Sequence, residues 1–494
     1  MNEKKIAFYK KLEELDVYNN ETFDFDEHNL IIEKIYSEGL KFNNCIFNCN
    51  SISFKYIQNQ ATSIEFNNCT FNCNVSFNNC KLDTLKFLNT KNIKSLKVNG
   101  SLSNFEEKSE IKSFYFSNTL ENEKNKSENT NEIVLSVAFS FNNVLFKKYF
   151  EFNHINNSKG IFSFSNNIIG DELNIANRSC VFHSSNISSL KFNDNVFNSY
   201  TSFKNSTFSF NKDNFKNTGS HWNQSKFERN EFNKVNFSEI EIVDYIEFDD
   251  CKFHSTTWFE NCKNIYASEV KFTACKFEKY SLFDNSKFNK IKILHSNFLE
   301  KASFENIEIN HFKIHQVTFT GAAYFDDLNK TNDSAIEKWD RKTLRAIKRE
   351  LVNTHNQIDY LRFKAYELEA FKKEKNKSWK DNAILKLNSF SSKNGLDWFR
   401  GLLFTTITGF MFYLLYLCTY AIFMKNTLHF PNSIEDFFVG YLKFLNPFSL
   451  FKSPIEDAET YFFPLFSFML GKIFISYGIF QTVQAFRKFG VNGG

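Results

Sequence analysis

The chain has 494 residues with 64 phenylalanines, only 15 glycines and 4 prolines, and a formal net charge of +4. Residues 338–400 carry 16 Lys and Arg against 8 Asp and Glu, a local net of +8 that leaves −4 for the rest of the chain. A net charge of only −4 outside residues 338–400 argues against a strongly acidic protein surface. The first 15 residues are charged and lack the apolar stretch of a secretory signal, so we expect the ten cysteines to face a reducing cytoplasm.

Large apolar residues recur every five or six positions from residue 39 to residue 328, after a segment 1–38 that we interpret as an N-terminal cap. Phe42, Phe47 and Phe66 begin the series, which keeps an interval of five at its end, through Phe304, Ile309, Ile314, Phe319 and Tyr324. An interval of five fits neither a helix face nor a strand face. It is typical of a solenoid in which each side of a square coil sends one large side chain inward, so the sequence predicts a mainly β solenoid.

Small residues occupy a fixed place two positions before the inward residue. Six cysteines lie there, namely Cys45, Cys69, Cys80, Cys180, Cys251 and Cys275, and other repeats have Ser286, Ser296, Ala302, Val317 and Ala322. Reduced cysteine behaves as a small hydrophobe, so we interpret the cysteines as core residues rather than zinc ligands or disulfide partners. Asparagine is expected at the coil corners because it tolerates turn geometry. The polar run at about 118–132 is predicted to be a disordered excursion.

The pattern of a small residue, a variable residue, phenylalanine, a variable residue and asparagine resembles the bacterial pentapeptide-repeat proteins. The resemblance covers residues 40–326 and implies a right-handed quadrilateral β-helix. Because some members of that family are acidic rods that imitate DNA, DNA mimicry is a third functional alternative here, ranked last because of the small charge.

From residue 329 to residue 394 the apolar period becomes helical. Ile336, Leu344, Ile347 and Leu351 share one face, and Ile358, Leu361, Ala365, Leu368 and Phe371 share another, with a turn at 355–357. The stretch 349–371 resembles the helical hairpin that follows the β-helix in pentapeptide-repeat membrane proteins. We expect this basic collar to bind anionic lipid headgroups, with a nucleotide or oligonucleotide as the other candidate ligand, through Arg341, Lys342, Arg345, Lys348 and Arg349.

Residues 395–494 are predicted to form a transmembrane domain with spans at 401–424 and 461–486. The first holds no charged residue and the second only Lys472, and each is long enough to cross a bilayer. Basic residues flank both outer ends, which predicts two spans in the bacterial inner membrane with both termini and the β-helix in the cytoplasm. Between the spans, Ser433-Ile-Glu-Asp436 begins a helix that Asn446-Pro447 ends. Segment 433–451 is either re-entrant or an amphipathic helix on the outer leaflet.

Lys472 is the strongest candidate for a functional residue in the spans, because an ammonium inside a membrane usually faces a bundle interior or water. We predict that it lines a pore with Ser476 and lies near water or a carboxylate such as Glu435 or Asp436; the alternative is that it extends to the outer interface. Small residues predict close helix packing at Gly401, Thr405 and Gly409 of the first span and at Ser467, Gly471, Gly478 and Thr482 of the second.

No phosphate-binding loop, zinc-protease motif or serine-hydrolase motif occurs, so we expect neither an enzyme nor a cofactor. The segments around 394–404 and 478–488 resemble the C-terminal module of the same membrane proteins, which implies an ion-channel-like effector, in some cases in antiphage defence. The leading hypothesis is therefore a homo-oligomeric pore, with a tetramer favoured, gated by a ligand of the cytoplasmic β-helix. The alternative is a non-conducting membrane-anchored scaffold whose β-helix binds a protein partner.

Overall fold

The structure is a computed structural model, and the chain divides into two compact units, Met1–Ile336 and Glu337–Gly494. Each unit is described by itself. The described residues are 3–25, 28–33, 35, 39–100, 108–117, 137–153, 155–157, 160–170, 178–183, 185–209, 225–243, 245–264, 268–329, 333–374, 377–423, 433–448 and 461–487. The excursion predicted at 118–132 lies outside them.

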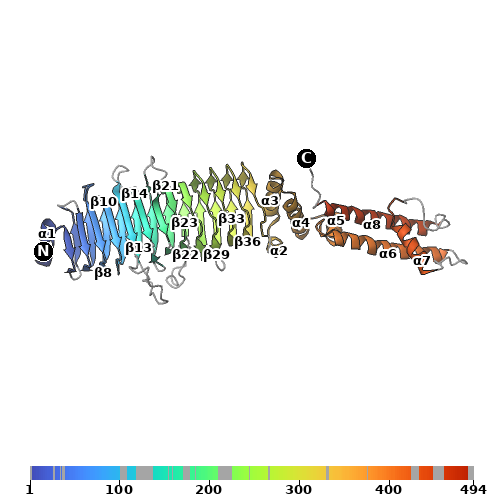
Figure 1. Cartoon of the computed structure of the whole chain (residues 1–494), viewed down its shortest axis with the longest axis horizontal. Coiled ribbons are helices and arrows are strands. Elements are labelled where there is room, and N and C mark those ends of the chain that lie inside the picture. Colours follow the sequence, from blue (N-terminus) through green and yellow to red (C-terminus); the bar gives the residue numbers. More distant parts are fainter. Residues whose placement is uncertain are drawn as a thin grey trace. The chain divides into compact units, whose positions relative to one another are not determined.

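The first unit is a β-solenoid whose strands pair only in parallel with those of the next coil (Figure 1). One side is the ladder β1 (Val17–Asn19), β4 (Gly39–Asn43), β7 (Ser63–Asn67), β10 (Lys81–Leu88), β12 (Ser109–Ser117), β14 (Val144–Asn153), β18 (Arg178–His183), β21 (Val196–Ser202), β24 (Glu231–Asn236), β28 (Thr257–Trp258), β32 (Ser281–Leu282), β35 (Ala302–Ser303) and β38 (Ala323–Tyr324). The adjacent side of the coil is formed by the first residues of β10, β12, β14, β21 and β24. It also includes β17 (Ile168–Ile169), β27 (Lys252–Phe253), β31 (Lys276–Phe277), β34 (Asn297–Phe298) and β37 (Thr318–Phe319).

Two further sides complete each coil. The longer ladder is β3 (Asn29–Ile32), β6 (Ser51–Lys55), β9 (Asn74–Asn78), β11 (Ser95–Asn99), β13 (Ala138–Asn142), β16 (Phe162–Ser165), β20 (Leu190–Asn193), β23 (Ser225–Glu228), β26 (Tyr245–Asp249), β30 (Glu269–Thr273), β33 (Lys287–Leu294) and β36 (Glu308–His315). The last side holds β2 (Thr22–Asp24), β5 (Ile46–Asn48) and β8 (Thr70–Phe71), then β15 (Asn156–Asn157), β19 (Asn186–Ser188), β22 (Thr207–Ser209), β25 (Glu241–Ile242) and β29 (Lys263–Asn264). The predicted β solenoid is confirmed.

The solenoid core consists of phenylalanine rings stacked from coil to coil. Phe253 and Phe277 lie 4.5 Å apart between ring centroids at an interplanar angle of 5°, and Phe277 and Phe298 lie 4.4 Å apart at 2°. Parallel in-register pairing places the same repeat position of successive coils directly above one another, so one residue type repeated in sequence becomes one column in space. Burial of these rings is the main stabilising term of the unit.

The small-residue position is buried, as the sequence predicts. Cys251 and Cys275 each donate the thiol to a carbonyl oxygen one coil back, Phe227 and Phe248, at 3.3 Å. The same position also accepts asparagine, which the sequence reading missed: Asn167, Asn195 and Asn230 are buried there, and their amides hydrogen-bond to one another and to carbonyl groups. At the corners, asparagine with positive φ recurs as predicted, for example at Asn44, Asn68, Asn79, Asn89, Asn285 and Asn306.

The predicted register is wrong by one residue in the last coil. Phe325 rather than Tyr324 is buried, and its ring lies 4.9 Å from that of Phe304. Ala323 rather than Ala322 therefore fills the small position. Tyr324 points outward, where the Lys301 ammonium lies 4.4 Å from its ring centroid. The spacing here is 21 residues per coil, one more than four pentads, and a strict interval of five cannot follow it.

Helices cover both ends of the solenoid unit. Helix α1 (Glu3–Glu14) buries Phe8 and Leu12, and Phe8 packs edge-to-face on Phe23 and Phe25 at 5.0 and 5.4 Å. The short helix α2 (Asp333–Ile336) contacts β36 and buries Ile336. Solenoid ends expose apolar residues unless they are covered, so these helices meet a physical need.

The described part of the second unit consists of the helices α3 (Arg341–Asn353), α4 (Gln357–Lys373), α5 (Trp379–Ser392), α6 (Trp398–Phe423), α7 (Ile434–Leu445) and α8 (Phe462–Phe486). The predicted antiparallel pair with its turn at 355–357 is present as α3 and α4. In α4 the predicted inner face is wrong at Ile358, which is exposed, whereas Phe363 and Tyr366 are buried. Helix α5 was not predicted.

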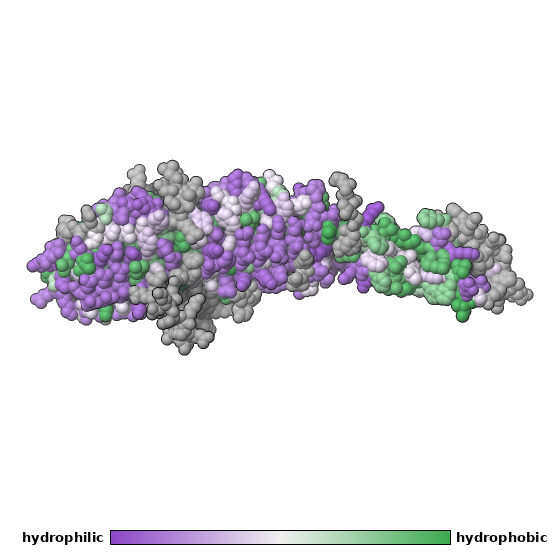
Figure 2. Space-filling model, viewed as in Figure 1, coloured by the Kyte–Doolittle hydropathy of each residue, from purple (hydrophilic) through white to green (hydrophobic). Residues whose placement is uncertain are grey.

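Helices α6 and α8 are long and apolar enough to span a membrane, within two or three residues of the predicted spans. Hydrophobic residues gather on the surface of this helical region, whereas the solenoid surface is mostly hydrophilic (Figure 2). The exposed side chains of α6 include Leu402, Leu403, Ile407, Met411, Leu414, Leu415 and Ile422. Large exposed apolar surfaces of this kind mark membrane or protein contacts.

Candidate functional site

Helices α6 and α8 pack against each other through small residues. A Cβ atom built on Gly401 would lie 2.7 Å from Thr482 Oγ1, and one built on Gly478 would overlap Thr405. These two contacts run in opposite chain directions, so the helices are antiparallel. Ser467 is buried near the other end of the pair, with its hydroxyl 3.3 Å from that of Thr419. Of the small residues named from the sequence, Gly401, Thr405, Ser467, Gly478 and Thr482 therefore lie between the two helices.

Helix α7 packs into the wedge between α6 and α8. The cluster of large side chains there comprises Tyr413, Tyr416, Leu417, Tyr420, Tyr441, Phe444, Phe468 and Ile475. Two glycines let α7 approach closely: a Cβ on Gly409 would lie 2.5 Å from Leu445, and one on Gly471 would lie 2.7 Å from the Phe444 ring. Ser433 caps the helix by accepting a hydrogen bond from the Asp436 amide at 3.0 Å.

Lys472 holds the end of α7. Its side chain is 1% exposed, and its Nζ donates to the carbonyl oxygens of Phe444 at 2.8 Å and Asn446 at 2.5 Å. The rings of Phe468 and Phe444 lie 5.0 and 5.6 Å from the ammonium. A cation at a helix C-terminus satisfies carbonyls that have no partner within the helix and interacts favourably with the helix dipole.

The other pore candidates do not join Lys472. Glu435 and Asp436 lie in the first turn of α7, at the opposite end from the carbonyls that Lys472 contacts, and both are exposed. Ser476, one turn after Lys472, is also exposed. Among the described residues, the Lys472 ammonium contacts backbone carbonyls rather than Glu435 or Asp436, and the lysine is buried instead of pointing toward solvent.

Helix α7 lies level with the middle of α6. Tyr413 donates to the Phe437 carbonyl at 3.2 Å, and Tyr441 donates to the Thr406 carbonyl at 2.7 Å. The rings of Phe410 and Phe437 lie 6.2 Å apart, and Phe410 is at the midpoint of the 26-residue helix α6. The first turn of α7, with its two carboxylates, therefore lies close to half the length of α6.

The basic residues of α3 are largely occupied by an acidic partner within the same unit. Arg345 Nε lies 2.9 Å and Arg341 Nε 3.7 Å from Glu367 Oε1, and Lys348 pairs with the other oxygen. Burial opposes ionisation of Glu367, but the hydrogen bonds from Lys348 and Arg345 outweigh it and lower its pKa. Of the five predicted ligand contacts, only Lys342 and Arg349 are exposed without an ion pair to another described residue.

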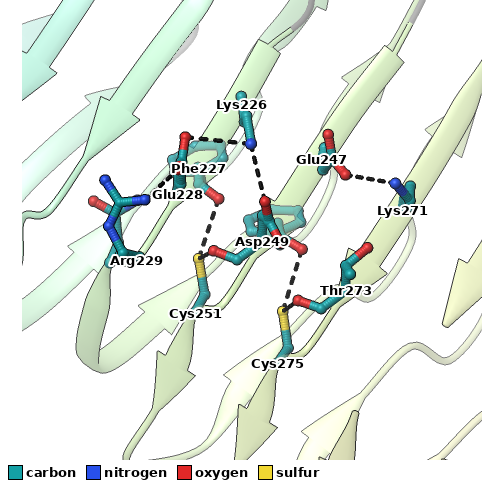
Figure 3. Close-up of polar contacts among 12 residues, drawn as sticks. Lys226, Phe227, Glu228, Arg229, Glu247, Asp249, Cys251, Lys271, Thr273 and Cys275 are labelled. Atoms are coloured by element: carbon teal, nitrogen blue, oxygen red, sulfur yellow. Dashed lines mark hydrogen bonds and ion pairs between the residues drawn. The ribbon is translucent and has the colours of Figure 1, made fainter. Parts of the chain in front are cut away.

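Charged side chains on the solenoid wall form ion pairs that connect neighbouring coils. Lys226 Nζ lies 2.9 Å from Asp249 and Lys271 Nζ lies 2.7 Å from Glu247 (Figure 3). Further along the wall, Glu269 pairs with both Lys290 and Lys292. Exposed pairs of this kind contribute at most about 1 kcal/mol each, but they balance the charge. The described wall presents alternating signs rather than the single-sign field that a nucleic acid or a DNA mimic requires.

No family model, no curated protein and no solved structure matches the chain. Sequence reasoning missed the partner of Lys472, because a backbone carbonyl carries no sequence signal. It also missed α5, although Ser378-Trp-Lys-Asp381 is a helix start in which Ser378 accepts the Asp381 amide at 3.1 Å.

Proposed function

We propose that this chain forms a homo-oligomeric membrane pore that conducts cations, with the first turn of α7 facing the conducting pathway and the solenoid on the cytoplasmic side. The observation that carries the proposal is the exposure of Glu435 and Asp436 next to the midpoint of α6. If α6 and α8 span the bilayer, two carboxylates at that depth cannot face lipid, because a charge there is costly without water or a partner. Oligomerisation around α7 would give them water.

The same geometry favours a re-entrant α7 over a helix on the outer leaflet. Helix α6 is about 39 Å long at 1.5 Å per residue, and the hydrocarbon core is about 30 Å thick. A helix bonded to Thr406 and packed on Phe410 lies well inside that core. Irregular backbone at this depth is tolerated where it is buried in protein or lines a cavity. Asn446 is exposed, so its backbone, whose carbonyl Lys472 contacts, would line the water-filled pathway.

The burial of Lys472 bears on the ion preference of the proposed pore. A ring of exposed ammonium groups would favour anions, but Lys472 is buried against α7. A ring of carboxylates favours cations, and Glu435 is the cleaner candidate because Asp436 also accepts a hydrogen bond from Ser433 at 2.9 Å.

The test is reconstitution of the full chain in lipid vesicles, with ion flux measured beside the subunit number in detergent by mass spectrometry. We expect an oligomer and potassium flux that falls several-fold in Glu435→Gln. Ser433→Ala is the matched control, since it removes the cap hydroxyl and keeps both charges. A monomer without flux under any ligand condition would contradict the proposal.

The resemblance to pentapeptide-repeat membrane proteins extends this proposal to regulation and biology. The stacked columns and the small-residue position are what such repeats require, so we propose that the solenoid is of this type and binds the ligand that opens the pore. An antiphage role would appear as depolarisation of infected bacteria that express the protein. An unchanged membrane potential during infection counts against that role.

A non-conducting scaffold is the second candidate, and the observation that favours it is Tyr280, exposed at a solenoid corner next to the Lys279–Glu300 ion pair. Tyrosine is enriched in protein–protein interfaces. A monomeric, flux-inactive protein that binds one partner stoichiometrically through the solenoid wall would support the scaffold and replace the pore.

A further inference from the structure

Helix α5 carries large apolar side chains that are exposed in the described part of the chain. Trp379 is 78% exposed, Phe390 72% and Ile384 59%. At 100° per residue, Trp379, Ala383, Leu387 and Phe390 fall on one side of the helix, whereas Ile384 lies about 140° from Trp379. The buried residues Leu385 and Ser392 lie on the other side. An exposed stripe with one tryptophan and one phenylalanine has no role in a purely water-facing helix.

Basic residues accompany that stripe. Lys380 and Lys386 are exposed in the helix, Lys393 and Arg400 follow it, and Asp381 and Asp397 are the only acidic residues between 377 and 400. A helix with aromatic residues on one side and lysines beside them is typical of a segment that lies in the headgroup region of an anionic membrane. The charge thus complements phospholipids such as phosphatidylglycerol.

The stripe also continues the surface of the two long helices. Trp398 stacks on Phe486 at 5.1 Å between ring centroids, where the start of α6 meets the end of α8, and Phe399 beside it is exposed. The Phe390 ring lies 6.1 Å from Phe404 in the second turn of α6. Aromatic residues gather at membrane–water interfaces in this way.

A polar network joins α5 to α8. Gln481 Nε2 donates to Asn388 Oδ1 at 3.1 Å, Ser392 Oγ donates to Gln481 Oε1 at 2.7 Å, and the Tyr477 hydroxyl also donates to Asn388. Ser391 and Ser392 are fully buried. Because a buried network is costly to leave half satisfied, α5 and the last third of α8 are expected to move as one body.

We propose that α5 is an interfacial helix that rests on an anionic phospholipid surface through Trp379 and Phe390, and that the Asn388–Gln481 network transmits its position to α8. This inference rests on the proposed membrane location of α6 and α8. The sequence placed the lipid contact on α3, where Glu367 forms ion pairs with Arg341, Arg345 and Lys348. We place it on α5 instead.

The experiment uses the full chain in phosphatidylglycerol-containing vesicles with an environment-sensitive dye on single cysteines, quenched from water by iodide and from the bilayer by spin-labelled lipid. Cys418, exposed on α6, is the native reporter of insertion. In a Cys418→Ala background, Trp379→Cys and Phe390→Cys report the apolar side, and Asp381→Cys, about 160–180° around the helix from them, is the matched control. We expect iodide quenching to be several-fold weaker at 379 and 390 than at 381. We also expect quenching at 379 and 390 to be weaker in phosphatidylglycerol-containing vesicles than in vesicles of pure phosphatidylcholine.

Equal iodide access at 379, 390 and 381, with Cys418 protected, would overturn the inference and leave the membrane proposal intact. Iodide access at Cys418 as well would overturn both. Protection at 379 that appears in detergent without lipid and rises with protein concentration would show contact between copies of the chain, which also overturns the inference. As a test of the network, Gln481→Leu should remove the dependence of α8 hydrogen exchange on lipid charge, whereas unchanged dependence contradicts the coupling.

Discussion

The solenoid and the helical unit are stabilised by opposite strategies. In the solenoid, each contact is repeated in the next coil, so that Phe253, Phe277 and Phe298 perform the same task in turn. In the helical unit, individual contacts are not repeated. Lys472 binds the carbonyl groups at the end of α7, and Glu367 forms ion pairs with basic residues of α3. When one solenoid contact is lost, the equivalent contacts in the neighbouring coils remain. When a contact of the helical unit is lost, no equivalent contact remains. Function is therefore expected to concentrate in the helical unit.

The largest effect is expected from a hole in the middle of a phenylalanine column. Phe277→Ala should cost about 3–5 kcal/mol, since it removes a fully buried ring with a stacking partner on each side. Phe319→Ala, in the last coil and only partly buried, is the matched control and should cost clearly less. Denaturant unfolding of the full chain in detergent, followed by the β signal in circular dichroism, gives both values. Equal losses would mean that the columns do not carry the stability.

Replacing Lys472 tests the unique contact. Lys472→Met keeps the length and leaves the Phe444 and Asn446 carbonyls without their donor, which should weaken the docking of α7 by roughly 2–3 kcal/mol. Hydrogen exchange of the α7 amides should accelerate while the solenoid amides keep their protection. Ser476→Ala, one exposed turn away, should change neither. If α7 exchange is unaltered by the methionine, Lys472 does not anchor the helix.

The Glu367 cluster should make the α3–α4 pair sensitive to acid. Its pKa is lowered in the folded state, so its ionised form contributes stability above the unfolded value of 4.5, and that contribution is lost as pH falls through the lowered value. Glu367→Gln should cost about 1–2 kcal/mol at neutral pH, discounted because Arg345 is more than half exposed. Thermal unfolding of the variant should then depend less on pH than that of the wild type. A parallel pH dependence would show that other carboxylates are responsible.

The smallest effect is expected in the small-residue position. Cys251→Ser should cost less than about 1 kcal/mol, because serine already fills this place at Ser286 and Ser296 and donates to a carbonyl there. Burial raises the pKa of the Cys80 thiol to about 11 and that of Cys262 to about 12, so these thiols stay protonated and should resist alkylation in the native protein. Rapid labelling at neutral pH without unfolding would contradict the tight packing of the coils.

The solenoid could be predicted from the sequence because parallel stacking of coils places large apolar residues at a regular interval of about five. The reading failed where the coil length departed from that interval, as at Phe325, and where chemistry rather than size decided, as at the buried Asn195. In the helical unit, the spans, the small-residue stripes and the Ser433 start of α7 carried sequence signals. The partner of Lys472 and the exposure of Glu435 did not, because they follow from how three helices pack. Such contacts arise only after folding brings distant segments together.

The most direct measurement of the central claim is the reversal potential of the reconstituted full chain across a potassium chloride gradient in a planar bilayer. If the carboxylates of α7 face the conducting pathway, the wild type should pass potassium in preference to chloride, and Glu435→Lys should reduce or invert that preference. The Lys472→Met variant should alter opening more than selectivity. A chloride preference in the wild type, or a reversal potential that is the same in Glu435→Lys, would contradict the placement of α7 in the pathway.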